Sequence, residues 1–111
     1  MDTLSLYRTL VRDIILRYAK VQPAVGDVES EIVFDEAQDH YALMSSGWVN
    51  GYRIHGSVLH VDIRGGKIWI QHDGTEEGIA EALVAGGVPR DHIVLAFKAP
   101  EARKYTDYAV A

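Results

Sequence analysis

Two tight-turn signals constrain this chain more than any other feature of its sequence. Asn50-Gly51 lies between stretches in which apolar and polar residues alternate, and Gly65-Gly66 lies in a similar setting. Both pairs are typical of two-residue β-hairpin turns, because their residues readily adopt the positive φ angles that such turns require. The two turns therefore predict three successive antiparallel strands, at residues 40–49, 52–63 and 68–71.

The turns also fix how these strands pair. We expect Asp62 opposite Trp69 in the second hairpin, and the same register puts His60 opposite Gln71. The apolar phase of the longer strand changes near Gly56-Ser57, which predicts a β-bulge at that point. One face of the second hairpin is apolar and should form the core, with Leu59, Val61, Ile63, Ile68 and Ile70.

A helix and a further strand should precede this meander. Apolar residues at helical spacing predict a helix over residues 3–20, which should end near Gln22 because Pro23 disfavours the helical conformation in the residue before it. Alternation predicts a strand over residues 28–35. The polar face of the helix carries four bases, Arg8, Arg12, Arg17 and Lys20.

A second helix and a fifth strand should follow. Asp73 can cap a helix, with Glu76 as its capping-box partner, and this helix should end at Gly86. Residues 93–97 form a short apolar run that predicts a strand. We therefore predict an α+β fold over residues 1–111 as a single domain. An antiparallel meander of four to five strands would carry the N-terminal and second helices on one face.

The charge balance bears on the class of partner. The chain has 111 residues, with 16 acidic against 11 basic side chains and a net charge of −5. Residues 21–50 contain six acids and no Lys or Arg. We read this stretch as a solvated surface. The alternative is an acidic docking surface for a basic partner or for the basic face of the first helix in another subunit. Extended DNA contact depends on many Lys and Arg side chains, so the balance predicts weak or indirect DNA contact.

Composition also bears on location. There is no cysteine, which excludes disulfides and thiolate metal sites and fits a reducing compartment. No apolar run approaches the roughly 18 residues that span a membrane. The first residues lack a basic segment followed by an apolar stretch, so we expect a cytoplasmic protein without a signal peptide or a membrane contact.

Histidines are the only residues in this sequence that suggest a catalytic or metal-binding site. Phosphate-binding loops, nucleophile elbows and HExxH zinc motifs are absent from the sequence. His60 and Asp62 lie two residues apart on one strand face, and with a third ligand from a neighbouring strand they could hold a metal ion. Polar residues on a solvated sheet face explain the same pattern more simply. We therefore predict no metal, no cofactor and no enzymatic activity.

Aromatic residues on the outer face of the sheet indicate a contact surface. Trp69 should lie there with His60, Asp62 and Gln71, and we expect Trp48 nearby, together with Met44. Exposed tryptophans are enriched in interfaces. Two ways to cover them remain open: the C-terminal tail, with Tyr105 and Tyr108, or a second subunit. We expect a homodimer with Trp69 or Trp48 in its contact.

The chain resembles the XisI family of cyanobacterial fdxN-element excision controlling factors, in order and spacing over nearly its whole length. The blocks that carry the resemblance are Phe34-Asp35, Asp39-His40-Tyr41, Gly47-Trp48, residues 55–63 and 66–71, Gly74-Thr75-Glu76, Ile79-Ala80, Gly87-Val88-Pro89, Ile93-Val94-Leu95, Tyr105-Thr106 and Ala109-Val110.

The resemblance implies an accessory role in programmed excision of a DNA element. It implies a recombinase system and a companion protein called XisH as partners, and it transfers no catalytic residues. The tail departs from the family pattern at two places. Lys98-Ala99-Pro100 replaces a common His-Pro-Pro run, and Asp107 replaces a common Gly.

Three functions follow from these observations. The first is a non-enzymatic accessory factor that acts through protein contacts. The second is an excision factor that binds DNA directly, through the basic helix face. The third, which the sequence supports least, is a small metal-dependent hydrolase that uses His60 and Asp62.

Overall fold

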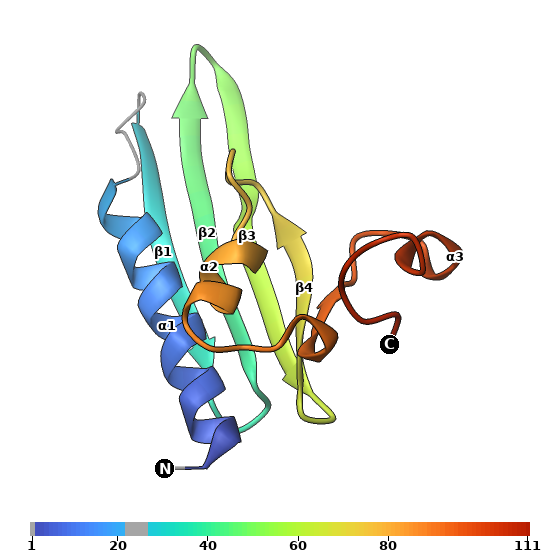
Figure 1. The fold of residues 1–111 in the computed structure, drawn as a ribbon. Helices are drawn as coiled ribbons and strands as arrows, with labels where there is room; N and C mark the ends of the chain where they lie inside the picture. The colour runs from blue at the N-terminus through green and yellow to red at the C-terminus, as the bar shows by residue number, and fades with distance from the viewer. Residues whose placement is uncertain (1, 22–26) are drawn as a thin grey trace.

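The computed structural model describes residues 2–21 and 27–111. Most of its strands follow one another along the chain without a helix between them (Figure 1). The expected end of the first helix, near Gln22, lies outside the described residues. The elements are α1 (Thr3–Val21), β1 (Asp27–Asp35), β2 (His40–Val49), β3 (Tyr52–Arg64), β4 (Lys67–Asp73), α2 (Ala80–Ala85), a 3₁₀ turn (Arg90–His92), β5 (Ile93–Leu95) and α3 (Pro100–Arg103).

One five-stranded sheet runs in the order β1-β2-β3-β4-β5, and its first four strands form the predicted antiparallel meander. The last strand differs from the prediction, because β5 pairs with β4 in parallel. The connection through α2 and the 3₁₀ turn is long enough for the crossover that a parallel pair needs. The α+β class is confirmed, with a mixed sheet rather than a purely antiparallel one.

The hairpin registers are confirmed at the turns and deviate at one point. Asp62 pairs with Trp69 as predicted, whereas His60 pairs with His72 instead of Gln71. A register shift beside His60 leaves Gln71 as an extra residue on β4, and such a shift is a second bulge. A bulge on β3 is present, one residue after the predicted Gly56-Ser57: Val58 is the extra residue, since Leu59 pairs with Leu43 and Ser57 with Met44.

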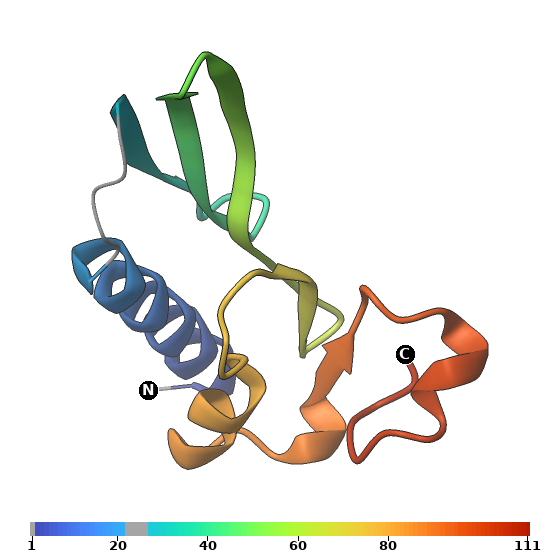
Figure 2. The same ribbon diagram turned by 90° about the horizontal axis from the view of Figure 1, so that it is seen from above.

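Both longer helices cover the same face of the sheet, and the core lies between them and the strands (Figures 1 and 2). The segment that carries α3 lies beyond β4, away from α1. The predicted core-face residues of β3 and β4 are all buried. They pack in one cluster with residues of the other elements, which include Tyr7, Val11, Ile15, Tyr41, Leu43, Ile79 and Leu83.

The second helix is shorter than predicted. It begins at Ala80 rather than Asp73, because Gly78 adopts a left-handed conformation (φ 78°) that interrupts any helix. The carboxylate of Asp73 holds the preceding loop instead: it accepts hydrogen bonds from the backbone N–H groups of Thr75 (3.0 Å) and Ile79 (2.7 Å). The expected capping box with Glu76 is therefore wrong.

None of the helices within residues 2–21 and 27–111 is long and apolar enough to cross a membrane.

Candidate functional site

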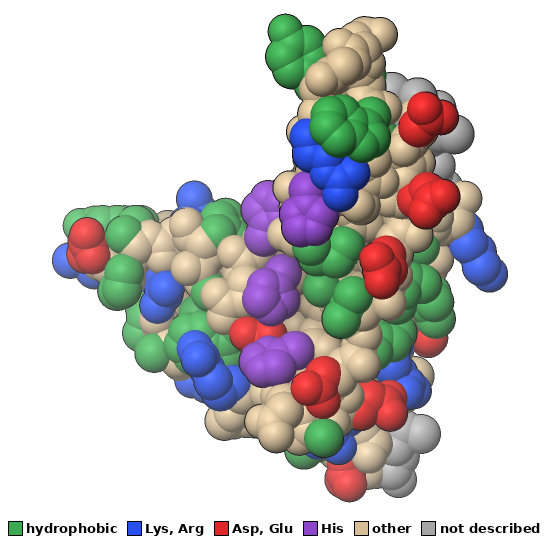
Figure 3. All heavy atoms as spheres, turned by 180° about the vertical axis from the view of Figure 1, so that it is seen from behind, with side chains coloured by type: hydrophobic (Ala, Val, Ile, Leu, Met, Phe, Trp, Pro, Cys, Tyr) green, Lys and Arg blue, Asp and Glu red, His purple; other side chains and the backbone are tan. Residues whose placement is uncertain are grey.

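The outer face of the sheet, which faces away from α1 and α2, carries the predicted site residues. Strand β2 pairs with β1 without interruption, so its alternate residues from His40 to Trp48, Met44 among them, share this face. Histidine side chains form a column along it (Figure 3). The strand pairing explains this column. His60 pairs with His72 of β4 on one side, and on the other side it pairs with Ala42, two residues from His40 on β2.

A polar cluster lies in the middle of this face. The Oδ1 atom of Asp62 lies 2.7 Å from Nδ1 of His40 and 3.0 Å from Nε2 of His60. The other carboxylate oxygen of Asp62 accepts a hydrogen bond from Nε2 of Gln71, at 3.2 Å. The hydrogen bond to Asp62 raises the pKa of His40 above its ordinary value of 6.5. We call His40, His60, Asp62 and Gln71 the outer-face cluster.

Trp69 lies next to this cluster, opposite Asp62, and two arginine side chains lie near its ring. The guanidinium of Arg64 lies 4.1 Å from the ring centre, and that of Arg103 lies 5.8 Å from it. The indole N–H donates to the carbonyl of Arg64, at 3.3 Å. The tail thus contributes Arg103 to the surroundings of Trp69, whereas Tyr105, at 82% exposure, stays in solvent.

Trp48 shares the outer face but lies far from Trp69. It pairs with Arg53, nine residues before Asp62 on β3, which corresponds to roughly 30 Å of strand. The expectation that the two tryptophans are neighbours is therefore wrong. Trp48 is 54% exposed, the neighbouring Tyr52 is 75% exposed, and the guanidinium of Arg53 lies 5.5 Å from the Trp48 ring centre.

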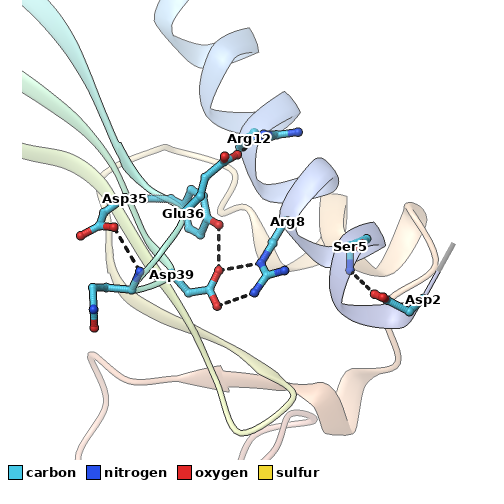
Figure 4. Close-up of polar contacts among 9 residues, drawn as sticks. Asp2, Ser5, Arg8, Arg12, Asp35, Glu36 and Asp39 are labelled. Atoms are coloured by element: carbon cyan, nitrogen blue, oxygen red, sulfur yellow. Dashed lines mark hydrogen bonds and ion pairs between the residues drawn. The ribbon is translucent and has the colours of Figure 1, made fainter.

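Acidic residues of the β1–β2 turn neutralise half of the basic helix face (Figure 4). Arg8 donates from two nitrogens to both carboxylate oxygens of Asp39, at 2.8 and 3.0 Å, and Arg12 pairs with Glu36. Tyr41 also donates to Asp39, at 2.9 Å. These bonds dock the turn on α1 within one chain. Part of the segment 21–50, which contains no Lys or Arg, therefore contacts the basic face of α1 in the same chain.

The two Arg8 bonds lower the pKa of Asp39, and the same pairing raises the pKa of Arg8. Burial raises the pKa of Tyr41 to about 12, and its hydrogen bond to Asp39 adds to the effect. Arg17 and Lys20 remain exposed further along α1.

Asp39→Asn is expected to lower the free energy of unfolding by about 1.5 kcal/mol near neutral pH, because charge-assisted hydrogen bonds to a partly exposed Arg are lost. Asparagine tolerates the left-handed conformation of this position (φ 57°), so the change isolates the charge. The lowered pKa means that the stabilisation is present above the ordinary value of 3.8 and disappears as the pH falls through the folded value.

Urea unfolding at neutral and acidic pH measures this difference. The exposed Asp13 of α1 offers a matched control, and Asp13→Asn should change the stability by less than about 0.5 kcal/mol. An undiminished difference at about pH 2 would contradict the role given to the Asp39 charge.

The sequence model of the XisI protein family matches residues 1–110. The chain belongs to the XisI family. Two solved structures from Anabaena variabilis ATCC 29413 are similar to it over 99% of this chain and 100% of theirs. One is a XisI-like protein, with 42% identity and a TM-score of 0.91. The other is fdxN element excision controlling factor XisI, with 32% identity and a TM-score of 0.89. No curated protein matches the chain closely enough to count as a relative.

Sequence reasoning missed one member of the outer-face cluster of this XisI-family chain. His60, Asp62 and Gln71 were predicted to lie together, and His40 was not included. The signal lies in the hairpin register: counting back from Asn50-Gly51 through the bulge puts His40 opposite Asp62. The presence of the bulge decides the match, because without it the same counting would put Val61 rather than Asp62 opposite His40.

A groove of about 520 Å³ lies on the helix side of the molecule, away from the outer-face cluster. It separates the C-terminal part of α1 from the loop and first turn of α2. Its lining residues are Arg17, Tyr18, Glu77, Gly78, Glu81 and Ala82.

Proposed function

We propose that this chain is a non-enzymatic accessory factor that supports site-specific excision of a DNA element. It acts in the cytoplasm through protein contacts with a recombinase system and with a XisH-like companion. The observation that carries the proposal is its likeness, over 99% of its length, to a protein described as fdxN element excision controlling factor XisI. A net charge of −5 supports protein contacts rather than extended contact with DNA.

The proposed contact surface is the outer face of the sheet, at its two aromatic positions. Trp48 offers an exposed ring on this face at the end of the β2–β3 hairpin, whereas the exposed Tyr52 pairs with Val49 and lies on the opposite face. Trp69, together with His60, Asp62 and Gln71, forms the other part. Tryptophan is among the residues most enriched in interface hot spots, which supports this assignment.

We further propose a two-fold homodimer with Trp48 in its contact. Trp48→Ala is expected to weaken this dimer about 30-fold or more, as loss of a hot-spot tryptophan does. Light scattering over a concentration series measures the change. Tyr105→Ala removes another exposed ring, in the tail, and should leave the dimer unchanged. A wild-type chain that stays at its monomer mass of 12.3 kDa at about 100 µM would contradict the dimer.

Direct DNA binding through Arg8, Arg12, Arg17 and Lys20 is the alternative function. Ion pairs of Arg8 with Asp39 and of Arg12 with Glu36 weaken it, because phosphates would have to compete with carboxylates already in place. The third possibility, a metal-dependent hydrolase, gains no support from the groove described above, because that groove lies on the helix side, away from His60 and Asp62.

The purified chain alone is expected to bind duplex DNA more weakly than about 10 µM at about 150 mM salt. Fluorescence anisotropy with a labelled duplex measures this affinity. Submicromolar binding that weakens when Arg17 and Lys20 are replaced by Gln would favour the alternative function.

A reporter plasmid that carries the excisable element tests the proposed role. Excision is scored by amplification across the new junction, in cells that contain the recombinase system with or without this chain. We expect excision to depend on the chain and to fall with Trp48→Ala but not with Tyr105→Ala. Equal excision in the absence of the chain would overturn the proposal.

A further inference from the structure

We propose that His40, His60 and Asp62 form a binding site for a divalent transition-metal ion such as Zn²⁺. One possible ligand atom from each residue lies within 4.8 Å of the others. The three residues come from adjacent strands, β2 and β3, whose pairing places His40 directly opposite Asp62. This inference does not depend on the proposed function. It replaces the prediction from the sequence that the chain holds no metal, because His40 supplies the third ligand that the sequence did not identify.

The donor set is suited to such an ion. Zn²⁺ binds imidazole nitrogen and carboxylate oxygen at about 2.0–2.2 Å, so neighbouring ligands of a tetrahedral site lie roughly 3.3 Å apart. The two imidazole nitrogens now lie 2.7 and 3.0 Å from the same oxygen of Asp62. These two oxygen–nitrogen separations would have to grow by about 0.3–0.6 Å, with a small turn of the imidazoles, to admit the ion. Two His and one carboxylate leave further positions for water, as in sites with three protein ligands.

Gln71 supplies the support that metal ligands usually have. Its side-chain N–H group holds the second oxygen of Asp62, which leaves Oδ1 turned toward both imidazoles. Hydrogen bonds of this kind fix the orientation of ligating carboxylates. Gln71 follows Trp69 by two residues on β4, so strand alternation places its side chain on the outer face beside Asp62.

Burial differs among the three ligands in a way that favours ion entry. The Asp62 side chain is 11% exposed, while those of His40 and His60 are 57% and 40% exposed. The carboxylate thus lies at the base of the site, and the imidazoles can turn outward to admit an ion from solvent. A carboxylate so shielded binds a cation more strongly than an exposed one, because water screens it less.

Isothermal titration of the chelator-treated chain with Zn²⁺ tests the site. The titration is done at about pH 7.5, because the ion binds the deprotonated imidazole and releases any proton held there. We expect one ion per chain, and a loss of affinity of about 100-fold or more for His60→Gln and for His40→Gln. Gln71→Ala should lower the affinity about 10-fold, as loss of an orienting hydrogen bond does. His55 lies exposed on the same face outside the cluster, so His55→Gln should retain wild-type affinity.

Nitrogen NMR of the imidazole rings identifies the ligands directly. Zn²⁺ should shift the ring nitrogens of His40 and His60 and leave those of His55 and His92 in place. Thermal unfolding without metal establishes that each variant is folded, and the half-exposed His40 provides a variant with little effect on the core. No binding by the wild type, or equal binding by His60→Gln, His40→Gln and His55→Gln, would overturn the site.

Discussion

Ile70→Ala is expected to lower the free energy of unfolding by about 3 kcal/mol. Ile70 is fully buried on β4, where it lies between Val61 of β3 and Leu95 of β5 on the core face of the sheet. Its replacement removes three methylene or methyl groups from a packed core and leaves a cavity that neighbouring strands cannot close. Chemical denaturation monitored by tryptophan fluorescence measures the change.

Ile32→Ala is the matched control, since it removes the same atoms from β1. Ile32 is 40% exposed, and its replacement should cost less than about 1 kcal/mol. Equal losses from the two variants would contradict the register of the second hairpin, because that register alone puts Ile70 in the core.

Gly47→Ala is expected to destabilise the chain by about 3 kcal/mol or to separate the start of β1 from β2. A Cβ atom at Gly47 would lie 2.0 Å from the carbonyl oxygen of Asp27 and 2.6 Å from Cα of Val28. Both are backbone atoms of β1, so no side-chain movement relieves the contact. Hydrogen exchange at the backbone amides of β1, together with denaturation, distinguishes global destabilisation from local strand separation.

Gly56→Ala provides the comparison on the neighbouring strand. A Cβ atom at Gly56 has no atom within 4 Å, and the stability should change by less than about 0.5 kcal/mol. If Gly47→Ala were as stable as Gly56→Ala, with β1 equally protected, the close approach of β1 to β2 would be contradicted.

The sequence predicted the meander because its turn residues have few alternatives. Asn50 adopts a positive φ (49°), as does Gly51 (80°), and the pairing that follows from this turn is the observed one. Alternation then separates buried from outer residues along each strand, and Leu59 and Ile68 lie in the core as expected. Local backbone chemistry and a period of two residues are sufficient for this part of the fold.

Features that depend on contacts between distant segments were not predictable in the same way. The parallel pairing of β5 depends on the path of the connection from β4, which no local pattern specifies. The late start of α2 follows from an Asp73 carboxylate that binds the backbone of its own loop in place of a helix N-terminus. Short polar side chains can satisfy either arrangement, so the sequence alone does not choose between them.

The candidate site was predicted in part. His60, Asp62 and Gln71 were placed together because they share one hairpin. His40 reaches the same point only through a second hairpin and a bulge, so its membership depends on two registers at once. Trp48 was assigned to the correct face, because the face of a strand residue follows from whether its position is odd or even. It was wrongly placed next to Trp69, because the distance along the sheet depends on how many residues separate the two positions.

Complex formation with a XisH-like companion tests the central claim most directly. The two proteins are co-expressed, purified through a tag on the companion, and measured by size-exclusion chromatography with light scattering. We predict a complex that contains this chain in a fixed ratio and that weakens with Trp48→Ala while Tyr105→Ala leaves it intact. A chain that elutes alone in every case, and binds duplex DNA with submicromolar affinity without the companion, would contradict an accessory role based on protein contacts.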